Sequence, residues 1–402
     1  MKITDLKLRQ LTGAMAYDGE LWEERGARPL DIYPAYRGLN VEDSTRRAFP
    51  ARSDGRYQIK QTFLNVETDE GVTGVVGPLT GDATAYYIAT QLRPLLIGQD
   101  PIRTEYLWDV MYRNAPNGRS GDNMIAISHV DYALWDIRAK WLNQPVLALL
   151  GGAVQERIPA YASTAGYSLD PDKAAERAAS IREQGFTGTK WFFRRGVGDG
   201  LDGERANIHL MEALRDGAGP DVKVMIDAWA NWGVDYTLRM AKSLAAYDPA
   251  WIEEPVQYAL RDSYAYLKST SPVPIAGGEH DFTRWSVKEM LDADMLDVYQ
   301  FEPIWAGGLT EMMKINALVT AYDVTFVPHV YVPAASAPVA FTLNAMTTPM
   351  LEYHLVLGEI YQHFLRTPLK PQAGYFHPPD GIGLGLDVDE EKVEEERAVS
   401  FG

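Results

Sequence analysis

Three acidic residues recur at one fixed interval in the second half of this chain of 402 residues. Asp227, Glu253 and Glu279 each follow a short apolar run, and neighbouring members of the series are 26 positions apart. Glu302 and His329 continue the series at intervals of 23 and 27 positions. One β-strand, one helix and their connections fill an interval of this length. The spacing therefore predicts successive βα units, each with an ionisable residue at an equivalent point.

Eight short β-like runs alternate with helical stretches across this region, which favours a parallel sheet. Several runs are almost continuously apolar before a polar residue, as expected for strands buried on both faces whose carboxyl ends open to a site. The runs are IPAYAS, TGTKWFF, VKVMIDA, AWIEEP, VPIAGGE, LDVYQFE, VTFVPHV and MLEYH. In a closed (β/α) barrel these carboxyl ends converge on one mouth. We therefore expect the five ionisable residues to share one pocket.

The first third of the chain has a different pattern. The runs ITDLKLRQL and IKQTFLNVET predict paired strands, and apolar residues at helical spacing predict a helix from about Asn123 to Leu142. Between the strands lies GAMAYDGELWEERGARPLDIYPAYRGLN, which contains four Tyr or Trp residues. A structureless loop of this length is usually a functional lid or disordered, and its aromatic content favours a lid.

Composition excludes several classes of function. The chain contains no cysteine, so disulfides, thiolate metal sites and thiol nucleophiles are excluded. A net charge of −17 argues against nucleic acid as a partner, because phosphate binding needs concentrated Lys and Arg. The chain has no apolar run of about 20 residues for a membrane span and no secretion signal in MKITDLKLRQ, so we expect a cytoplasmic location. For the acidic tail DVDEEKVEEER we predict a solvated final helix.

Asp227, Glu253 and Glu279 would bring three negative charges close together at the barrel mouth. A low-dielectric site holds such a cluster only when a cation neutralises it. Without cysteine, cations that prefer oxygen ligands are favoured, and three carboxylates suit one octahedral Mg²⁺ ion per active site. Any one acid alone would be interpreted as a salt-bridge or capping residue, but the regular spacing of all three favours a metal site. Strand alternation puts Glu254 on the other side, as a structural partner, for example of a pocket lysine.

His329 and Glu302 are the candidates for acid–base chemistry. A carboxylate bonded to one ring nitrogen of a histidine fixes its tautomer and raises the basicity of the other nitrogen. Lys190 in TGTKWFF would stabilise a substrate carboxylate or developing negative charge, pair with a pocket acid, or do both. Glu352 in MLEYH would donate a hydrogen bond to an oxyanion if burial raises its pKa.

In combination, these motifs resemble the mandelate racemase subgroup of the enolase superfamily. The motifs are IDAW, WIEEP, GGEH, AGG at 306–308, VPH, and SHVDYALWDIRAKW followed by PVLALLGG. The resemblance covers nearly the whole chain and implies an α/β fold, a (β/α)7β modified TIM barrel with an α+β capping domain. It implies a cap with lid loops over residues 1–155, the barrel over 156–365, and a segment over 366–402 that packs back on the cap.

The resemblance also implies abstraction of the proton next to a substrate carboxylate, with Mg²⁺ stabilising the enediolate. His329 matches the family's base and Glu302 its supporting acid, although the family usually has Asp there. Lys190 matches the first lysine of a Lys-x-Lys pair, but Phe192 stands in place of the second. The metal ligands implied by position are Asp227, Glu253 and Glu279.

Loss of the second base disfavours a two-base racemase. It fits a dehydratase in which one histidine removes the α-proton and returns a proton to the departing hydroxyl. The chain resembles sugar-acid dehydratases related to rhamnonate dehydratase, which implies a hydro-lyase that converts an aldonate-type sugar acid to a 2-keto-3-deoxy acid. The sequence does not choose between pentonate, hexonate and 6-deoxyhexonate. The substrate contacts that we predict are His280, Tyr33, Arg52 and Arg56, the arginines because their planar group binds carboxylates and hydroxyls.

Other functions would make different demands on the same residues. A racemase, epimerase or cycloisomerase of a carboxylate substrate would use the same scaffold. A barrel glycosidase would need paired acids across the barrel and no metal cluster, whereas VTFVPHV ends in a histidine. A non-catalytic sugar-acid binder would have lost a ligand or the base. We expect a small anionic sugar acid as the partner, no nucleic acid or membrane, and a homo-oligomer.

Overall fold

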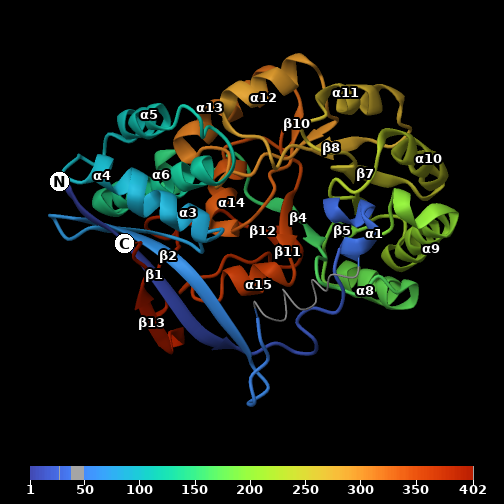
Figure 1. The fold of residues 1–402 in the computed structure, drawn as a ribbon, viewed down its shortest axis with the longest axis horizontal. Coiled ribbons are helices and arrows are strands. Elements are labelled where there is room, and N and C mark those ends of the chain that lie inside the picture. Colours follow the sequence, from blue (N-terminus) through green and yellow to red (C-terminus); the bar gives the residue numbers. More distant parts are fainter. Residues whose placement is uncertain (27, 38–48, 402) are drawn as a thin grey trace.

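The computed structural model describes residues 1–26, 28–37 and 49–401. Figure 1 shows a strand barrel surrounded by helices, drawn from green to orange, beside a sheet of long blue strands. Residues 38–40 of the predicted lid and 45–48 of the arginine-rich segment TRRAFPARSDGRYQ lie outside the described residues. No helix in the described part of the chain is long and apolar enough to cross a membrane.

The barrel is a series of seven βα units followed by an eighth strand, and all eight strands lie parallel. The strands are β4 (Ile158–Ser163), β5 (Gly188–Phe192), β6 (Lys223–Asp227), β7 (Pro249–Glu253), β8 (Ile275–Gly277), β9 (Val298–Tyr299), β10 (Thr325–Phe326) and β11 (Leu351–His354). The helices between them are α8 (Pro171–Glu183), α9 (Gly200–Ala218), α10 (Val234–Leu244), α11 (Arg261–Thr270), α12 (Thr283–Asp292), α13 (Leu309–Ala321) and α14 (Pro333–Phe341).

The strand order around the barrel follows the chain, with β11 beside β4. The amide of Phe326 in β10 donates to the carbonyl of Thr347 at 2.8 Å, which brings the segment before β11 next to β10. All eight predicted strands and the (β/α)7β architecture are therefore confirmed.

One layer of side chains inside the barrel explains where the polar residues point. Its buried members are Tyr161, Met225, Trp251, Ala276, Val298, Val327 and Met350, one from in or beside each strand except β5. In β5 the equivalent residue is Gly188, where a Cβ would lie 2.8 Å from Met225 Cε. Successive side chains of a strand alternate between faces, so the residue two positions after each member points into the barrel at the next level, toward the mouth.

The cap is an antiparallel sheet in the order β13-β1-β2-β3 covered by helices. It contains β1 (Ile3–Met15), β2 (Tyr57–Thr68), β3 (Thr73–Val76), α3 (Asp82–Tyr87), the π-helix η2 (Ile88–Leu92), α4 (Arg93–Leu96), α5 (Thr104–Asn114) and α6 (Gly121–Leu142). The helix expected from about Asn123 to Leu142 is confirmed as α6. Short elements lie between these. In the segment between β1 and β2 are η1 (Pro29–Ile32) and α1 (Pro34–Arg37), and α7 (Val146–Leu149) connects α6 with β4. Within the barrel, η3 (Val197–Asp199) precedes α9 and η4 (Ala245–Tyr247) precedes β7, while α15 (Leu357–Tyr361) and β12 (Tyr375–Phe376) follow β11.

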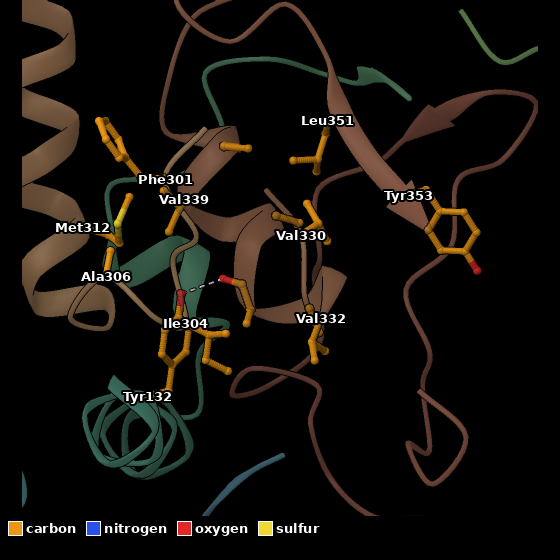
Figure 2. Packing of buried hydrophobic residues seen from close by; sticks show 14 of the residues in the cluster. Tyr132, Phe301, Ile304, Ala306, Met312, Val330, Val332, Val339, Leu351 and Tyr353 are labelled. Carbon is orange, nitrogen blue, oxygen red and sulfur yellow. Dashed lines mark hydrogen bonds between the residues drawn. The ribbon is translucent and has the colours of Figure 1, made fainter. Parts of the chain in front are cut away.

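Helix α6 joins the cap to the barrel through a continuous apolar core. Thirteen of its residues are buried, which is why the helix is apolar nearly all round. Figure 2 shows Tyr132 of α6 next to Ile304, which follows β9. The hydroxyl of Tyr132 donates to the carbonyl of Ala335 at 3.0 Å. The cap is thus attached to the barrel at a fixed position.

The prediction of a final helix in the acidic tail is wrong. The acidic tail forms the short 3-10 helix η5 (Glu390–Lys392) and the exposed strand β13 (Glu395–Ala398), which pairs with β1. Arg9 of β1 bonds both Glu390 and Glu396. A sheet edge offers unpaired backbone groups, and Arg9 neutralises part of the tail charge, so the tertiary partner outweighs local helix preference.

Candidate active site

A cavity of about 340 Å³ lies at the mouth of the barrel. Its wall combines ionisable residues from the strand ends with aromatic residues and a segment of the cap. The lining residues are Trp22, Arg25, Gly26, Arg28, Ala165, Lys190, Phe192, Asp227, Trp229, Glu279, Trp305, His329, Tyr331, His354, Leu357 and Tyr361. The predicted pocket at the strand ends therefore exists, and the cap closes part of it.

The interior layer accounts for most of the charged mouth. Counting two residues beyond each layer member leads to Ser163, Lys190, Asp227, Glu253, Gly278, Gln300, His329 and Glu352. Seven of these eight have polar side chains that can carry or bond charge, and all seven are buried. Glu279 follows Gly278, whose φ of +112° turns the chain at the end of β8. Strand alternation thus gathers the predicted site residues at one level of the barrel.

Lys190 is the centre of the carboxylate cluster. Its Nζ lies 2.5 Å from Glu253 Oε1, 2.9 Å from Glu352 Oε1 and 3.4 Å from Asp227 Oδ2. Burial alone would lower the pKa of Lys190, but the negative charges of Glu253 and Glu352 raise it well above its ordinary value. Lys190 therefore remains an ammonium group and pairs with acids from three strands.

Glu253 and Asp227 differ in how their charge is balanced. Besides Lys190, Glu253 accepts hydrogen bonds from Trp251 Nε1 at 3.0 Å and Gln300 Nε2 at 2.8 Å. The side chain of Asp227 accepts a hydrogen bond from the amide of Trp229 at 2.9 Å and has Lys190 at the longer distance of 3.4 Å. Burial and the charge of Glu253 raise the pKa of Asp227 well above its ordinary value. An additional cation beside Asp227 would relieve this repulsion.

The donor set fits Mg²⁺, because Asp227, Glu253 and Glu279 offer oxygen ligands at adjoining strand ends. In the present conformation Lys190 links Asp227 with Glu253, while Glu279 Oε2 faces His329 Nε2 at 3.4 Å. In this conformation, the potential ligand atoms that lie close together in groups of three belong to other sets of described residues than Asp227, Glu253 and Glu279. They are Glu254, Glu279 and His280 in one group, and His329, Glu352 and His354 in another.

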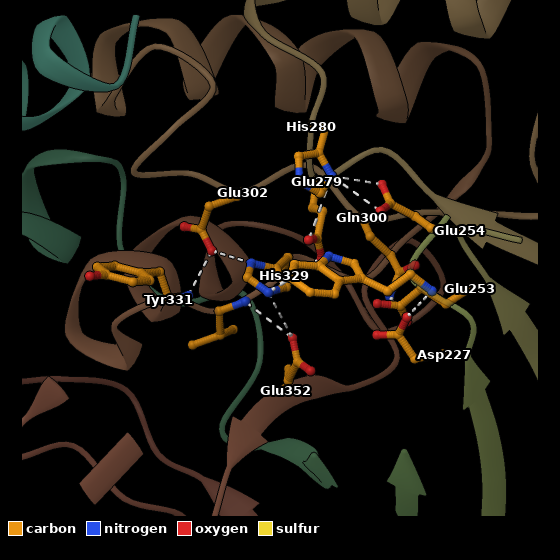
Figure 3. Close-up of polar contacts among 12 residues, drawn as sticks. Asp227, Glu253, Glu254, Glu279, His280, Gln300, Glu302, His329, Tyr331 and Glu352 are labelled. Carbon is orange, nitrogen blue, oxygen red and sulfur yellow. Dashed lines mark hydrogen bonds and ion pairs between the residues drawn. The ribbon is translucent and has the colours of Figure 1, made fainter. Parts of the chain in front are cut away.

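His329 and Glu302 form the predicted pair, as Figure 3 shows. His329 Nδ1 lies 2.8 Å from Glu302 Oε2, so glutamate reaches the histidine. Glu302 is held by the amides of Tyr331 at 2.6 Å and Ile304 at 3.0 Å. Burial alone would lower the pKa of His329, but the charge of Glu279 and the bond to Glu302 raise it to about 10. Because Nδ1 is occupied by Glu302, the other ring nitrogen, Nε2, is available on the side of the cavity.

The predicted role of Glu352 as a hydrogen-bond donor needs correction. Burial would raise its pKa, but the positive charges of Lys190 and His329 outweigh burial and lower the pKa below the ordinary value. Glu352 is thus an ionised partner of Lys190 and accepts from the amide of Val330 at 3.3 Å. Burial lowers the pKa of His354 to about 4, so this cavity-lining histidine is neutral.

His280 lies beside the cavity wall rather than in it. Its Nδ1 is 3.1 Å from both carboxylate oxygens of Glu254, and its ring stacks on Tyr258. Burial alone would lower the pKa of His280, but the bond to Glu254 and the charge of Glu279 raise it to about 9. The structural partner of Glu254 is therefore a histidine, not a pocket lysine. Glu254 leaves the strand with a φ of +38°, which separates it from Glu253.

The other predicted substrate contacts lie away from the cavity wall. Arg52 bonds Glu394, and Arg56 bonds Asp54, on the outside of the cap. Tyr33 is about half exposed and packs edge-on against Tyr36. The planar guanidinium group that favours a ligand contact serves a surface ion pair equally well, so residue type alone does not distinguish the two.

The cap residues of the wall that no prediction named are Trp22, Arg25, Gly26 and Arg28. They belong to the segment predicted as a lid, so its length and aromatic content were the available signal. Gln300 and His354 were also missed. Both follow from the two-residue alternation, but only after the interior layer is known.

The comparisons with known proteins agree with this geometry. Residues 173–392 match the family described as enolase C-terminal domain-like. Residues 41–151 match the mandelate racemase / muconate lactonizing enzyme N-terminal domain. The chain is 31% identical over 404 residues to L-rhamnonate dehydratase of Saccharopolyspora erythraea, with 97% of each chain covered.

Two further similar proteins have different named activities. The chain is 30% identical to D-galactarolactone cycloisomerase of Agrobacterium fabrum over 352 residues, which cover 83% of this chain and 90% of that one. Rhamnonate dehydratase from Gibberella zeae, solved as a complex with Mg, has a TM-score of 0.82 at 26% identity and 97% and 95% coverage. With both domain matches and a relative matched over nearly its full length, the chain belongs to the mandelate racemase subgroup of the enolase superfamily.

Proposed function

We propose that this protein is a Mg²⁺-dependent dehydratase, a hydro-lyase, of an aldonate-type sugar acid. It would remove the proton next to the carboxylate and eliminate the 3-hydroxyl, giving a 2-keto-3-deoxy acid. The observation that carries the proposal is the pair of His329 and Glu302 at the mouth, joined at 2.8 Å, with Phe192 lining the wall where a second base would stand. The relatives named rhamnonate dehydratase support the same class of reaction.

His329 is the acid–base group of the proposed reaction. Glu302 holds Nδ1, which orients Nε2 toward the substrate. Nε2 takes the α-proton, and the same nitrogen returns a proton to the departing 3-hydroxyl, so one group serves both steps on one face. Lys190 supplies positive charge for the substrate carboxylate, and Glu352 keeps Lys190 charged.

Asp227, Glu253 and Glu279 are the residues that we propose to hold one Mg²⁺ ion. When bound, the ion supplies positive charge beside the substrate carboxylate and offsets the charge of Glu279, a main cause of the raised pKa of His329. Lys190 would then have to share Asp227 and Glu253 with the ion, since it contacts both acids. The raised pKa of Asp227 supports this assignment, because it records negative charge that the protein leaves uncompensated.

The cavity indicates the shape of the substrate. Arg25 and Arg28 line it on the cap side, and aromatic residues form much of the remaining wall. A volume of about 340 Å³ suits a small sugar acid. We further propose a cytoplasmic homo-oligomer in which 1–155 is the cap, 156–365 the barrel and 366–402 the returning segment.

A screen of pentonates, hexonates and 6-deoxyhexonates with Mg²⁺ tests the function. We expect one or a few acids to yield a 2-keto-3-deoxy acid, detected by mass loss of one water and by reaction of the new ketone with a carbonyl reagent. Chelation of divalent ions should stop turnover, and added Mg²⁺ should restore it. Absence of any dehydrated product across the set would overturn the proposal.

A cycloisomerase or epimerase is the second candidate, favoured by the similarity to D-galactarolactone cycloisomerase. Both alternatives begin with the same proton abstraction but keep the hydroxyl. In deuterated water, an epimerase would put deuterium at C2 of recovered substrate without loss of water. A cycloisomerase would convert a lactone without a change of mass. Phe192 favours the dehydratase, because it stands where the family's second lysine would be and can neither accept nor donate a proton.

A further inference from the structure

Two adjacent acids of the lid contact the barrel rather than the cavity. Trp22 and Arg25 line the cavity, whereas Glu23 and Glu24 between them do not. Figure 1 shows the dark blue chain after β1 crossing from the cap sheet to the barrel. The two acids therefore lie where this crossing segment reaches the barrel.

Glu23 bonds the first βα unit at three points, two in the loop after β4 and one in α8. Its amide donates to the carbonyl of Gly166 at 2.7 Å, and its Oε2 accepts from the amide of Ser168 at 3.1 Å. Its Oε1 accepts from Arg177 Nη2 of α8 at 2.8 Å. Arg177 in turn stacks over Tyr167, with 3.9 Å between its guanidinium carbon and the ring centre. The first βα unit thus holds Glu23 by its backbone and by both carboxylate oxygens.

Glu24 repeats this pattern one residue later. Its amide donates to Gly166 at 3.2 Å, and its Oε2 accepts from the amide of Leu169 at 2.9 Å. Its Oε1 accepts from Arg194 Nη1, just beyond β5, at 2.9 Å. Both acids are about three-quarters buried, and both partner arginines are more than half buried. The lid is therefore attached to the first two βα units at once.

Close backbone approaches accompany these bonds. A Cβ on Gly166, which has a φ of +96°, would lie 2.7 Å from the ring of Trp22. A Cβ on Gly26 would lie 2.8 Å from Phe192 Cβ. Both glycines are therefore needed for the lid to lie this near to the barrel. Within the lid, Arg25 makes a buried ion pair with Asp31, with N···O distances of 2.6 and 3.0 Å.

We propose that Glu23 and Glu24 are positioning residues that clasp the lid to the barrel and so hold Trp22 and Arg25 against the substrate. The substrate contact rests on the proposed function, whereas the clasp itself rests on the contacts above. The carboxylates accept charge-assisted hydrogen bonds from two backbone amides and two arginines. Such bonds are strong, and the backbone amides also fix the position of each carboxylate. Without the clasp, substrate binding must order a free loop, which weakens affinity.

The first test removes the charge and keeps the shape, with Glu23→Gln, Glu24→Gln and the double variant. The matched control is Glu204→Gln, because Glu204 also pairs with an arginine, Arg239, at 2.8 Å, but on the outer helices α9 and α10. We expect KM for the sugar acid to rise about tenfold in the double variant with kcat within about twofold, the signature of lost ground-state binding. The Glu204 variant should match the wild type in both constants.

The second readout does not depend on activity. Hydrogen exchange of the amides of Ser168 and Leu169, which donate to the two acids, should accelerate at least tenfold in the double variant and remain unchanged in Glu204→Gln. Faster exchange with unchanged KM would overturn the positioning role. Unchanged exchange would overturn the clasp. If no sugar acid turns over even in the wild type, the proposed function fails, and the exchange result still decides the clasp.

A third variant displaces the lid without altering either acid. Gly26→Ala puts a methyl group 2.8 Å from Phe192 Cβ, which cannot move away because it is attached directly to β5. We expect the same rise in KM, with faster exchange of Ser168 and Leu169. Wild-type constants in Gly26→Ala would contradict the close docking of the lid.

Discussion

His329 Nδ1 lies 2.8 Å from Glu302 Oε2, and two backbone amides hold that carboxylate in place. Glutamate thus fills the position where the family usually has aspartate, because Glu302 reaches the ring from the chain just after β9. The contact selects the tautomer and leaves Nε2 for chemistry.

The first prediction concerns this pair. His329→Asn should lower kcat by about 10²–10⁴-fold, the usual contribution of a positioned acid–base group, with the affinity for Mg²⁺ retained in calorimetry. Glu302→Gln should lower kcat by about 10–100-fold, as expected when an orienting partner is lost. His209→Asn, on the exposed face of α9, is the control. Turnover by His329→Asn at the wild-type rate would remove His329 as the base.

The second prediction concerns Lys190, the buried cation among three acids. Removing one partner of a buried ion cluster costs roughly 3–5 kcal/mol, so Lys190→Met should lower the Tm of the metal-free protein. Added Mg²⁺ should raise the Tm of this variant more than that of the wild type, because it neutralises the same carboxylates. Lys314→Met, which breaks an exposed pair with Glu105, should change little. An unchanged Tm for Lys190→Met would contradict the assigned role.

The third prediction concerns Asp131 of α6, which accepts from the amide and hydroxyl of Thr310. Burial raises the pKa of Asp131 to about 7. Between about pH 4 and 7 the unfolded chain loses this proton while the folded chain keeps it, so ionisation favours unfolding and stability falls as the pH rises.

The side chain of Asp131→Asn cannot ionise. The free energy of unfolding of this variant, relative to that of the wild type, should therefore increase by up to about 1.4 kcal/mol for each pH unit across this window. Urea unfolding at pH 5, 6, 7 and 8 measures the difference, which should level off above pH 7. A difference that is independent of pH would show that Asp131 titrates normally.

The fourth prediction concerns β13, which covers the edge of β1. Truncation after Asp389 should leave the barrel folded but expose the backbone groups of β1, so the protein should self-associate as its concentration rises. Light scattering after size exclusion measures this. Arg9→Met keeps the strand while breaking the bonds to Glu390 and Glu396, and should keep the oligomeric state of the unaltered protein. Identical behaviour of the truncated and full chains would show that the edge is protected in another way.

The strand positions were predictable because each βα unit repeats one local pattern. A run buried on both faces must be apolar, and a polar residue at its carboxyl end marks the mouth. The interval of 26 positions therefore placed Asp227, Glu253 and Glu279 at neighbouring strand ends without any contact information. His329 and Glu302 followed from the same register, and the structure joins them.

The partners of these residues were not predictable in the same way. Glu254 bonds His280, and Glu352 is ionised by its neighbours, because both depend on side chains from other strands. The arginines chosen for the substrate, Arg52 and Arg56, bond acids outside the cavity.

The sequence by itself determined the barrel, its register and the acids of its mouth, since these depend on periodicity within each unit. Only the tertiary structure decided which charges meet, which part of the lid reaches the cavity, and that the acidic tail is a strand. These outcomes depend on contacts between segments far apart in the chain. Glu23 and Glu24 illustrate the difference: an ordinary acidic pair in the sequence bonds two βα units more than 140 positions away.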